Sequence, residues 1–183
     1  MIAGVCEALG RENSIAATDL LRDGYPFVSV PPAPRGYGPL EATRVFVRDG
    51  FIDRYAGTRL VFPPVLRLIS LILPGEFPYH PNWKTDRTHA AFWELGATID
   101  HVIPITRGGP DDDSNRITTS MARNSAKTNS TLEETGWRLH PPGRVAEWDG
   151  LLQWFLDYTA AHPRLKPPPS LRPWHRAALR VTR

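Results

Sequence analysis

The sequence predicts an α+β protein, and the prediction rests on one short unit in the second half of the chain. Residues 98–103 (TIDHVI) alternate in polarity, as a strand with one buried face does. Residues 104–110 (PITRGGP) end that strand in a loop, because proline and glycine interrupt strands. A second β-branched run follows at 117–119, and Ser120 can cap a helix over 121–127. The expected order is therefore strand, loop, strand and helix.

The same stretch resembles the HNH nucleases, which carry a ββα-metal site and are also called His-Me finger nucleases. The features that carry the resemblance are, in order, Asp100-His101, Ile103-Pro104, Arg107-Gly108-Gly109, Asn115 and the Asn-x-x-Lys motif from Asn124 to Lys127. The third signature residue of the family is His or Asn, so Asn124 makes the chain similar to the HNN variant. The resemblance covers about residues 44–130. It implies a ββα-metal core with additional helices and long proline-rich connections.

The chemistry of phosphodiester hydrolysis explains why these residue types are wanted. The reaction needs an activated water, a cation that neutralises developing charge, and groups that hold the phosphate. An imidazole accepts a proton near neutral pH, so His101 is the expected general base. Asp100 and Asn124 offer hard oxygens, which suit one Mg²⁺ ion, or Mn²⁺ or another divalent ion in its place. Because neighbouring side chains point to opposite faces of a strand, Asp100 and His101 can share a site only where the strand ends.

Three further residues have expected supporting roles. Asn115 matches the central Asn of the family, which holds the loop and keeps the general base oriented. Arg107 and Lys127 are candidate phosphate contacts. Taken singly, these features have plainer explanations: a lone His101 could be a satisfied half-buried histidine, Asn115 a turn residue, and the acidic run 111–113 a solvated loop or a cation site of its own. The ordered set of motifs favours a nuclease-type site.

The segment before this unit carries a second link to the family. Many HNH proteins have an Arg-Asp-Gly-aromatic run before a first cysteine pair, and a second pair before the last signature residue; the four thiolates bind a structural zinc. Here Arg48-Asp49-Gly50-Phe51 is kept, but the cysteine positions fall on Asp53, Ala56, Ser120 and Arg123. We therefore expect no structural zinc. We expect an ion pair between Asp53 and Arg123 in its place, the alternative being two independently solvated charges.

Composition sets limits on these expectations. The 183 residues suffice for a substantial core, and an apolar content of 41% is normal for a soluble globular protein. Nineteen prolines indicate long irregular connections, and a net charge of +3 with a pI of 9.3 fits a polyanionic partner. The single cysteine, Cys6, excludes an internal disulfide and a multi-cysteine metal cluster. With no apolar run of membrane length and no secretion signal at residues 1–14, we expect cytoplasmic residence.

Three regions are expected along the chain. Residues 1–40 form a helical lead-in that ends near Gly24 and a Pro/Gly-rich arm over 25–39; residues 41–162 form the HNH nuclease domain with its packing helices; residues 163–183 form a basic tail. The apolar face of the lead-in is expected at Ile15, Ala16, Leu20 and Leu21. The tail is either a sequence-independent phosphate contact or simply solvated.

Within the domain, residues 64–73 are the most apolar stretch and predict a core helix, which is also a candidate homodimer face. Residues 131–134 predict a capped turn, and residues 147–161 an amphipathic helix that packs on the core. Residues 75–96 interleave aromatic and basic side chains, which either flank DNA or form a packed aromatic loop.

The predicted function is metal-dependent hydrolysis of DNA phosphodiesters by an endonuclease with a histidine general base and a single divalent cation. The expected partner is double-stranded DNA, and the resemblance implies products with 5′-phosphate and 3′-hydroxyl ends. Two alternatives stay open: an HNH-fold nucleic-acid-binding protein whose catalytic site has decayed, and a partner-binding protein that uses the apolar helix. Loss of the zinc cysteines fits decay, whereas the retained Asp100, His101, Asn115 and Asn124 argue against it.

Overall fold

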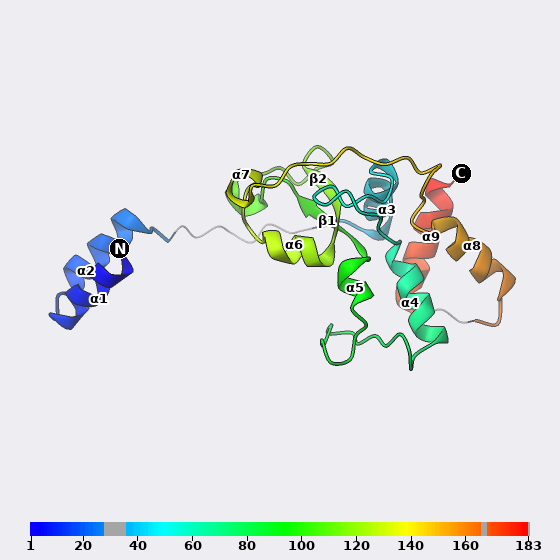
Figure 1. Ribbon diagram of the computed structural model, residues 1–183, viewed down its shortest axis with the longest axis horizontal. Helices are drawn as coiled ribbons and strands as arrows, with labels where there is room; N and C mark the ends of the chain where they lie inside the picture. The colour runs from blue at the N-terminus through cyan, green and yellow to red at the C-terminus, as the bar shows by residue number, and fades with distance from the viewer. Residues whose placement is uncertain (28–35, 166–167, 183) are drawn as a thin grey trace. The chain divides into compact units, whose positions relative to one another are not determined.

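Helices and one small antiparallel sheet make up the described chain, which is therefore α+β (Figure 1). The computed structural model describes residues 1–27, 36–165 and 168–182. The elements are α1 (Ile2–Gly10), α2 (Ser14–Gly24), α3 (Pro39–Arg48), α4 (Pro63–Ile72), α5 (Ala91–Glu94), β1 (Ala97–His101), η1 (Ile105–Arg107), β2 (Arg116–Ser120), α6 (Met121–Lys127), α7 (Leu132–Thr135), α8 (Leu152–Ala161), η2 (Pro169–Leu171) and α9 (Arg172–Val181). Two compact units are formed by Met1–Pro34 and Arg35–Arg183. The first boundary thus falls at Pro34, earlier than the expected residue 40.

The first unit is a pair of packed helices, α1 and α2. The Asn13 side chain caps α2 by accepting a hydrogen bond from Ala16 N at 3.0 Å, and α2 ends at Gly24 as predicted. Its expected apolar face is not buried, since Ile15 is 75% exposed. Ala17 and Val5 are the buried apolar residues of the pair instead. The proline-rich part of the predicted arm, residues 28–35, lies outside the described residues.

The second unit contains the predicted strand, loop, strand and helix. β1 pairs with β2 in antiparallel register, with Asp100 opposite Ile117 and His101 opposite Arg116. Ser120 ends β2 and caps α6, because its hydroxyl accepts a hydrogen bond from Arg123 N at 3.2 Å. α6 packs against both strands. The expected order of elements is confirmed, with each boundary within two residues of its prediction.

The free edge of β2 is covered by the segment that follows α3. Asp49 Oδ2 accepts a hydrogen bond from Thr118 N at 2.7 Å. Asp53 Oδ2 accepts one from Ser120 N at 2.9 Å. Arg54 N donates to Thr118 O at 2.9 Å. Both carboxylates are buried, so two aspartates and one backbone amide satisfy the groups that a third strand would otherwise pair.

A glycine makes this covering segment possible. Gly50 has φ +62°, a conformation that side chains disfavour. A Cβ at this position would lie 2.3 Å from the carbonyl carbon of Gly143, so the two backbones can approach only if residue 50 has no side chain. The Arg-Asp-Gly-aromatic run is therefore a tight turn whose aspartate, Asp49, is aimed at β2.

The predicted ion pair between Asp53 and Arg123 does not form. No ion pair among the described residues joins these side chains. Besides the bond to β2, Asp53 Oδ1 accepts hydrogen bonds from Tyr55 N and Thr119 Oγ1, while the Arg123 guanidinium lies 5.4 Å from the ring centroid of Trp137. A buried N–H group without an acceptor costs folding free energy, so the buried N–H groups of Tyr55 and Ser120 favour a carboxylate at this position. Asp53 thus links the covering segment to β2 by accepting a hydrogen bond from the backbone of Ser120.

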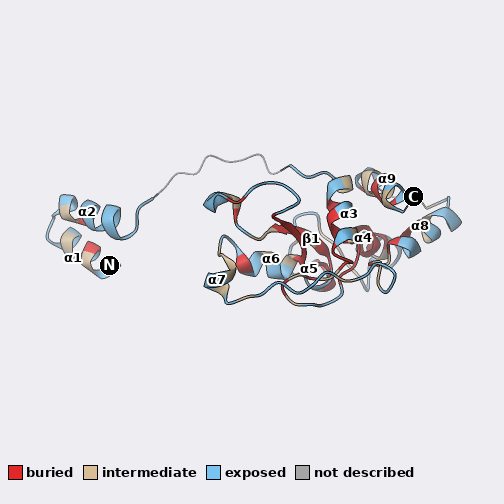
Figure 2. Ribbon diagram, turned by 90° about the horizontal axis from the view of Figure 1, so that it is seen from above, coloured by how far each residue is buried: buried red, intermediate tan, exposed pale blue. Residues whose placement is uncertain are grey.

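The core of the second unit lies between the sheet and the helices around it. Figure 2 shows buried residues, in red, along β1 and on parts of α3 and α4. Phe46, Phe51, Phe62 and Phe155 are fully buried, and Phe62 makes edge contacts with Phe51 and Phe155 at 6.2 and 5.7 Å. α4 matches the predicted core helix, and its exposed end (Leu71 to Leu73) leaves the dimer face a prediction. None of the described helices has the length and apolar character that a bilayer crossing requires.

The remaining predicted elements are matched in part. The capped turn forms as α7, with Thr131 and Glu134 bonding each other's backbone. α8 begins at Leu152, later than predicted, because Gly150 and Leu151 both take positive φ values. The aromatic loop is a packed one, in which the Phe92 ring lies 5.0 Å from Tyr79 and 6.0 Å from Trp83.

The C-terminal segment is not the tail that the sequence suggested. It forms α9, which packs on α3 with Ala177 and Ala178 buried in the interface. The Trp174 ring stacks on Phe46 with the ring centroids 6.5 Å apart. Both views place α3 between the sheet and α9 (Figure 1, Figure 2). The prolines and arginines of this segment hid an amphipathic helix that completes the core.

Candidate active site

The end of β1 brings three of the predicted residues to one small polar cavity. Its volume is about 60 Å³, and its lining residues are Asp100, His101, Pro104, Ile105, Asn124, Thr128 and Asn129. Asp100 and His101 are sequence neighbours and would face opposite ways within a regular strand. They share the cavity because β1 ends at His101 and the chain bends immediately after it.

Asp100 is held by two donors on one of its oxygens. Oδ2 accepts a hydrogen bond from the Tyr55 hydroxyl at 2.6 Å and lies 3.0 Å from Lys127 Nζ. Burial, and then the hydrogen bond to Asp100, raise the pKa of the Tyr55 hydroxyl, so it remains a proton donor. Oδ1 of Asp100 has no hydrogen-bond partner in the described part of the chain. No fully buried polar side-chain atom of the described residues lacks a partner, so this oxygen is accessible to solvent. One carboxylate oxygen is therefore fixed, and the other is open to a ligand.

Asn124 presents an oxygen in the same way. It lies on α6, and its Nδ2 donates a hydrogen bond to Ile99 O on β1 at 3.1 Å. Because the amide nitrogen must face that carbonyl, the orientation of the carboxamide is settled by the backbone of β1. Oδ1 is left without a partner among the described residues. The helix and the strand together position this side chain.

His101 is oriented by an acidic residue from the loop. Its Nε2 lies 2.8 Å from Asp111 Oδ1, and the same oxygen lies 2.6 Å from Arg116 Nη2. The Arg116 guanidinium, and then the His101 ring, lower the pKa of Asp111, so this carboxyl is ionised at neutral pH. An ionised acceptor places the ring proton of a neutral imidazole on Nε2. Nδ1, for which the described residues offer no partner, then carries the lone pair.

Asn115 locks the loop that follows β1. Its Oδ1 accepts a hydrogen bond from Ile103 N at 2.8 Å, and its Nδ2 donates to Ile103 O at 2.8 Å and to Pro110 O at 2.9 Å. The side chain is buried. All three bonds go to backbone groups of the loop, so Asn115 fixes its path, and it does not line the cavity. This is the placement that the family resemblance implies for the central Asn.

Lys127 is not where a phosphate contact would have to be. It is fully buried, and Nζ donates to His101 O at 2.8 Å besides facing Asp100 Oδ2. Its ammonium also lies 5.8 Å from the centroid of the Tyr55 ring. The buried carboxylate requires a countercharge, and the last turn of α6 supplies it. The sequence expectation for Lys127 is therefore corrected: it supports Asp100 and is closed off from any substrate.

Arg107 stays on the surface. It lies at the end of η1, and its Nη1 is 2.6 Å from Glu134 Oε1, with both side chains almost half-exposed. An exposed pair of this kind is weak and exchanges readily for another anion. Arg107 is thus available to a phosphate, as the sequence suggested, once Glu134 is displaced.

Tyr55, Asp111 and Arg116 are the residues of the site that sequence reasoning missed. In the sequence Asp111 is one of three consecutive aspartates, and nothing in the spacing distinguishes it from Asp112 and Asp113. Arg116 begins β2, and its side chain reaches back to the loop. Tyr55 comes from the segment covering β2, far from the motif in sequence. Each reaches the site through tertiary packing, which local patterns do not encode.

The donor set suits a hard, hydrated cation. Among the described residues no three His, Cys, Asp or Glu side chains gather as a ready metal cluster. The open oxygens are one carboxylate oxygen of Asp100 and the carboxamide oxygen of Asn124, on the wall of a cavity with room for water. Mg²⁺ commonly keeps several waters and takes one or two protein oxygens together with phosphate oxygens. The residues therefore fit such an ion and lack the soft ligands that zinc prefers.

Comparisons of the chain with protein-family models, with curated proteins and with solved structures found no match.

Proposed function

We propose that the protein is a metal-dependent endonuclease of the HNH type that hydrolyses phosphodiester bonds of DNA. The observation that carries the proposal is the convergence of Asp100, His101 and Asn124 on one small cavity at the end of β1. A single aligned motif could arise by chance. An imidazole with an oriented acceptor nitrogen beside two free hard oxygens is the arrangement that the reaction needs.

The chain's own residues would act as follows. His101 Nδ1 takes a proton from a water, while the Nε2–H group of the same ring stays hydrogen-bonded to Asp111. The resulting hydroxide attacks phosphorus, the bond from phosphorus to the 3′ oxygen breaks, and the leaving 3′ oxygen takes a proton from a solvent water, which gives a 5′-phosphate and a 3′-hydroxyl. Asp100 and Asn124 would hold the cation, which when bound supplies positive charge against the phosphate and leaving oxygens. Arg107 is placed to meet a flanking phosphate.

The substrate class is argued from charge and from the family resemblance. The described surface of the second unit carries several arginines without a carboxylate partner, and the whole chain has a net charge of +3. Such a balance favours a polyanion. Double-stranded DNA is the polyanion that the resemblance implies.

Incubation of the purified protein with supercoiled plasmid and Mg²⁺ or Mn²⁺ tests the proposal. We expect conversion to nicked circles, no conversion in EDTA, and a higher metal requirement for Asn124→Ala, because one of the two open oxygens is lost. Circular dichroism of the variant checks that it is folded. Plasmid that stays supercoiled at every metal concentration would contradict the proposal, and binding of DNA without cutting would favour the decayed alternative.

A further inference from the structure

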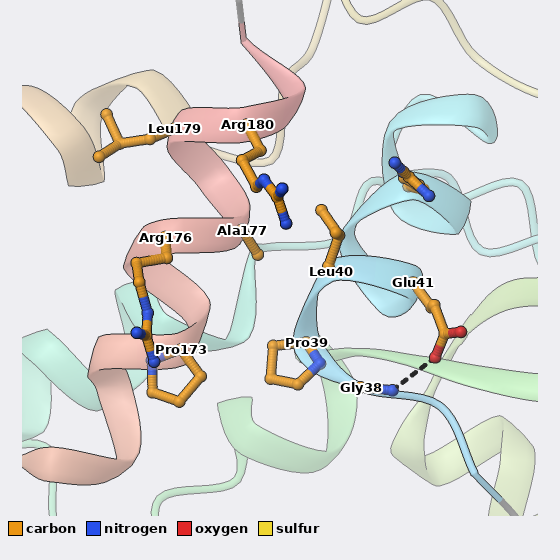
Figure 3. Close-up of a pocket in the computed structure, with 10 residues that line it drawn as sticks. Gly38, Pro39, Leu40, Glu41, Pro173, Arg176, Ala177, Leu179 and Arg180 are labelled. Carbon is orange, nitrogen blue, oxygen red and sulfur yellow. Dashed lines mark hydrogen bonds between the residues drawn. The ribbon is translucent and has the colours of Figure 1, made fainter.

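A groove runs between α3 and α9, away from the candidate active site. Its volume is about 720 Å³. Pro39, Leu40 and Ala177 give it an apolar floor, and Figure 3 shows the Arg180 side chain reaching across toward Leu40 while Arg176 lies along α9 beside Pro173. Arg44 of α3 also lines it. We call this set of Arg44, Arg176 and Arg180 with its floor the arginine groove.

The guanidinium groups of the arginine groove form no ion pair with any described residue. All three side chains are exposed, and none takes part in an ion pair with a described carboxylate. Glu41, the acidic residue of the groove, accepts a hydrogen bond from Gly38 N at 2.7 Å to close the first turn of α3. With three guanidinium groups and one carboxylate in its lining, the groove carries a net positive charge.

Seven of the fourteen other lysines and arginines in the described part of the second unit are in ion pairs. Arg48 and Arg54 bond Asp49, Arg107 bonds Glu134, and Lys127 lies against Asp100. By contrast, residues 163–182 contain no acidic residue, and Arg172 extends the row of α9 arginines at intervals of one helical turn. Four of the described cations without an ion pair, Arg44, Arg172, Arg176 and Arg180, therefore lie on α3 and α9.

The other face of α9 argues against insertion of this helix into a membrane. A basic amphipathic helix binds a bilayer by burying its apolar face in the lipid. Ala177 and Ala178 are 2% and 0% exposed, and Trp174 stacks against the core. Most of the apolar face of α9 is therefore buried in the core, and Leu179, at 37% exposure, is the large apolar side chain that α9 leaves exposed beside its arginines.

A second cavity has lining residues that are close in the chain to those of the arginine groove and to those of the active-site cavity. It has a volume of about 340 Å³ and is lined by Tyr37 and Trp174. These are the immediate chain neighbours of Gly38 and Pro173, which line the arginine groove.

Two other residues that line the same cavity come from the elements that carry the active site. Thr98 of β1 and Met121 of α6 line it. Thr98 lies two residues before Asp100, on the same face of the strand, and Met121 lies one helical turn before Asn124, on the same face of α6. The two elements that position Asp100 and Asn124 thus also contribute to the wall of this second cavity.

We propose that the arginine groove binds the phosphodiester backbone of the DNA at a distance from the bond that is cut; this rests on the proposed function. Guanidinium groups pair with phosphate oxygens through paired N–H donors, and arginines in a row match a repeating anion. The contact is to the backbone and carries no sequence information. It anchors the DNA while the small active-site cavity handles one linkage.

The test is the salt dependence of DNA binding in a protein that cannot cut. Fluorescence anisotropy with a labelled 30-base-pair duplex compares His101→Ala with the same protein carrying Arg176→Ala and Arg180→Ala. Each backbone contact contributes about 0.9 to the slope of log affinity against log salt, so the slope should fall by about 1.8. The matched control, Arg138→Ala with Arg144→Ala, removes the same charge from residues that do not line the groove and should leave the slope nearly unchanged.

Further readouts separate this proposal from the nuclease proposal. In the protein with His101 intact, Arg176→Ala with Arg180→Ala should slow cutting of the duplex yet leave hydrolysis of bis(4-nitrophenyl) phosphate unchanged, because that small diester needs only the active site. Equal slopes of log affinity against log salt for the groove variant and its control would overturn the proposal that the arginine groove binds DNA. So would tighter binding to phosphatidylserine vesicles than to the duplex.

Discussion

At the scale of single residues, the site depends on how one carboxylate orients His101. Asp111 accepts from His101 Nε2 at 2.8 Å and is itself held by Arg116. Asp111→Asn can present its amide nitrogen to Nε2 and so favours the tautomer with the proton on Nδ1, which cannot accept one from water. We expect the cutting rate to fall by at least about tenfold.

Asp113→Asn is the matched control for this change. It removes the same charge from the same loop, and the Asp113 carboxylate has no partner in the described structure. Single-turnover cutting of a labelled duplex measures both variants. Equal rates for the Asp111 and Asp113 variants would show that the carboxylate does not orient the base.

Asp111 also predicts how stability depends on pH. Its pKa in the folded protein lies below its ordinary value of 3.8, mainly because of Arg116. A group whose folded pKa is lowered contributes stability above its ordinary pKa and loses it as the pH falls through the folded value. The difference in unfolding free energy between the parent and Asp111→Asn should therefore shrink as the pH falls below 3.8. Urea titrations between pH 7 and pH 2.5 would reveal a constant difference if this view is mistaken.

Lys127 is the second residue whose role is read from its surroundings. It is fully buried between Asp100 and the backbone of His101. Lys127→Met leaves a buried carboxylate without its countercharge and should cost about 3–5 kcal/mol of unfolding free energy. The exposed Lys84→Met should stay within about 0.5 kcal/mol of the parent. Urea unfolding followed by circular dichroism compares them, and similar costs would mean that Lys127 is not the countercharge.

At the scale of elements, two aspartates replace a third strand on the edge of β2. Asp53→Ala leaves the N–H groups of Ser120 and Tyr55 without their acceptor in a buried place. We expect a loss of about 2–4 kcal/mol in unfolding free energy. Arg123→Ala should cost under about 1 kcal/mol, since its contact is with the Trp137 ring. Equal losses of unfolding free energy in the two variants would support the ion pair between Asp53 and Arg123 and contradict the hydrogen bonds described here.

The same elements show what the sequence could and could not predict. The strands, α4, α6 and α7 follow from alternation, capping residues and proline positions, which act over a few neighbouring residues. The partner of Asp53 could not be predicted from such local patterns, because the donors that a carboxylate meets depend on which residues the fold brings near it. A charge of opposite sign at Arg123 was the visible candidate, and buried backbone amides prevailed.

At the scale of the whole molecule, the second unit is completed by its last helix. α9 puts Ala177 and Ala178 into the core and stacks Trp174 on Phe46. Its small buried residues and many arginines gave it the composition of a solvated tail. The candidate site fared better, since Asp100, His101, Asn115 and Asn124 could be named from motif order, whereas the buried place of Lys127 required the packed structure.

The proposed hydrolysis depends on His101 as the group that activates water in the cavity that it shares with Asp100 and Asn124. The most direct test is the rate at which His101→Ala nicks supercoiled plasmid with Mg²⁺ or Mn²⁺, beside the parent at equal concentration and with folding checked by circular dichroism. Removal of a general base should slow cutting by about 10²–10⁴-fold. A folded His101→Ala protein that cuts as fast as the parent would contradict the account.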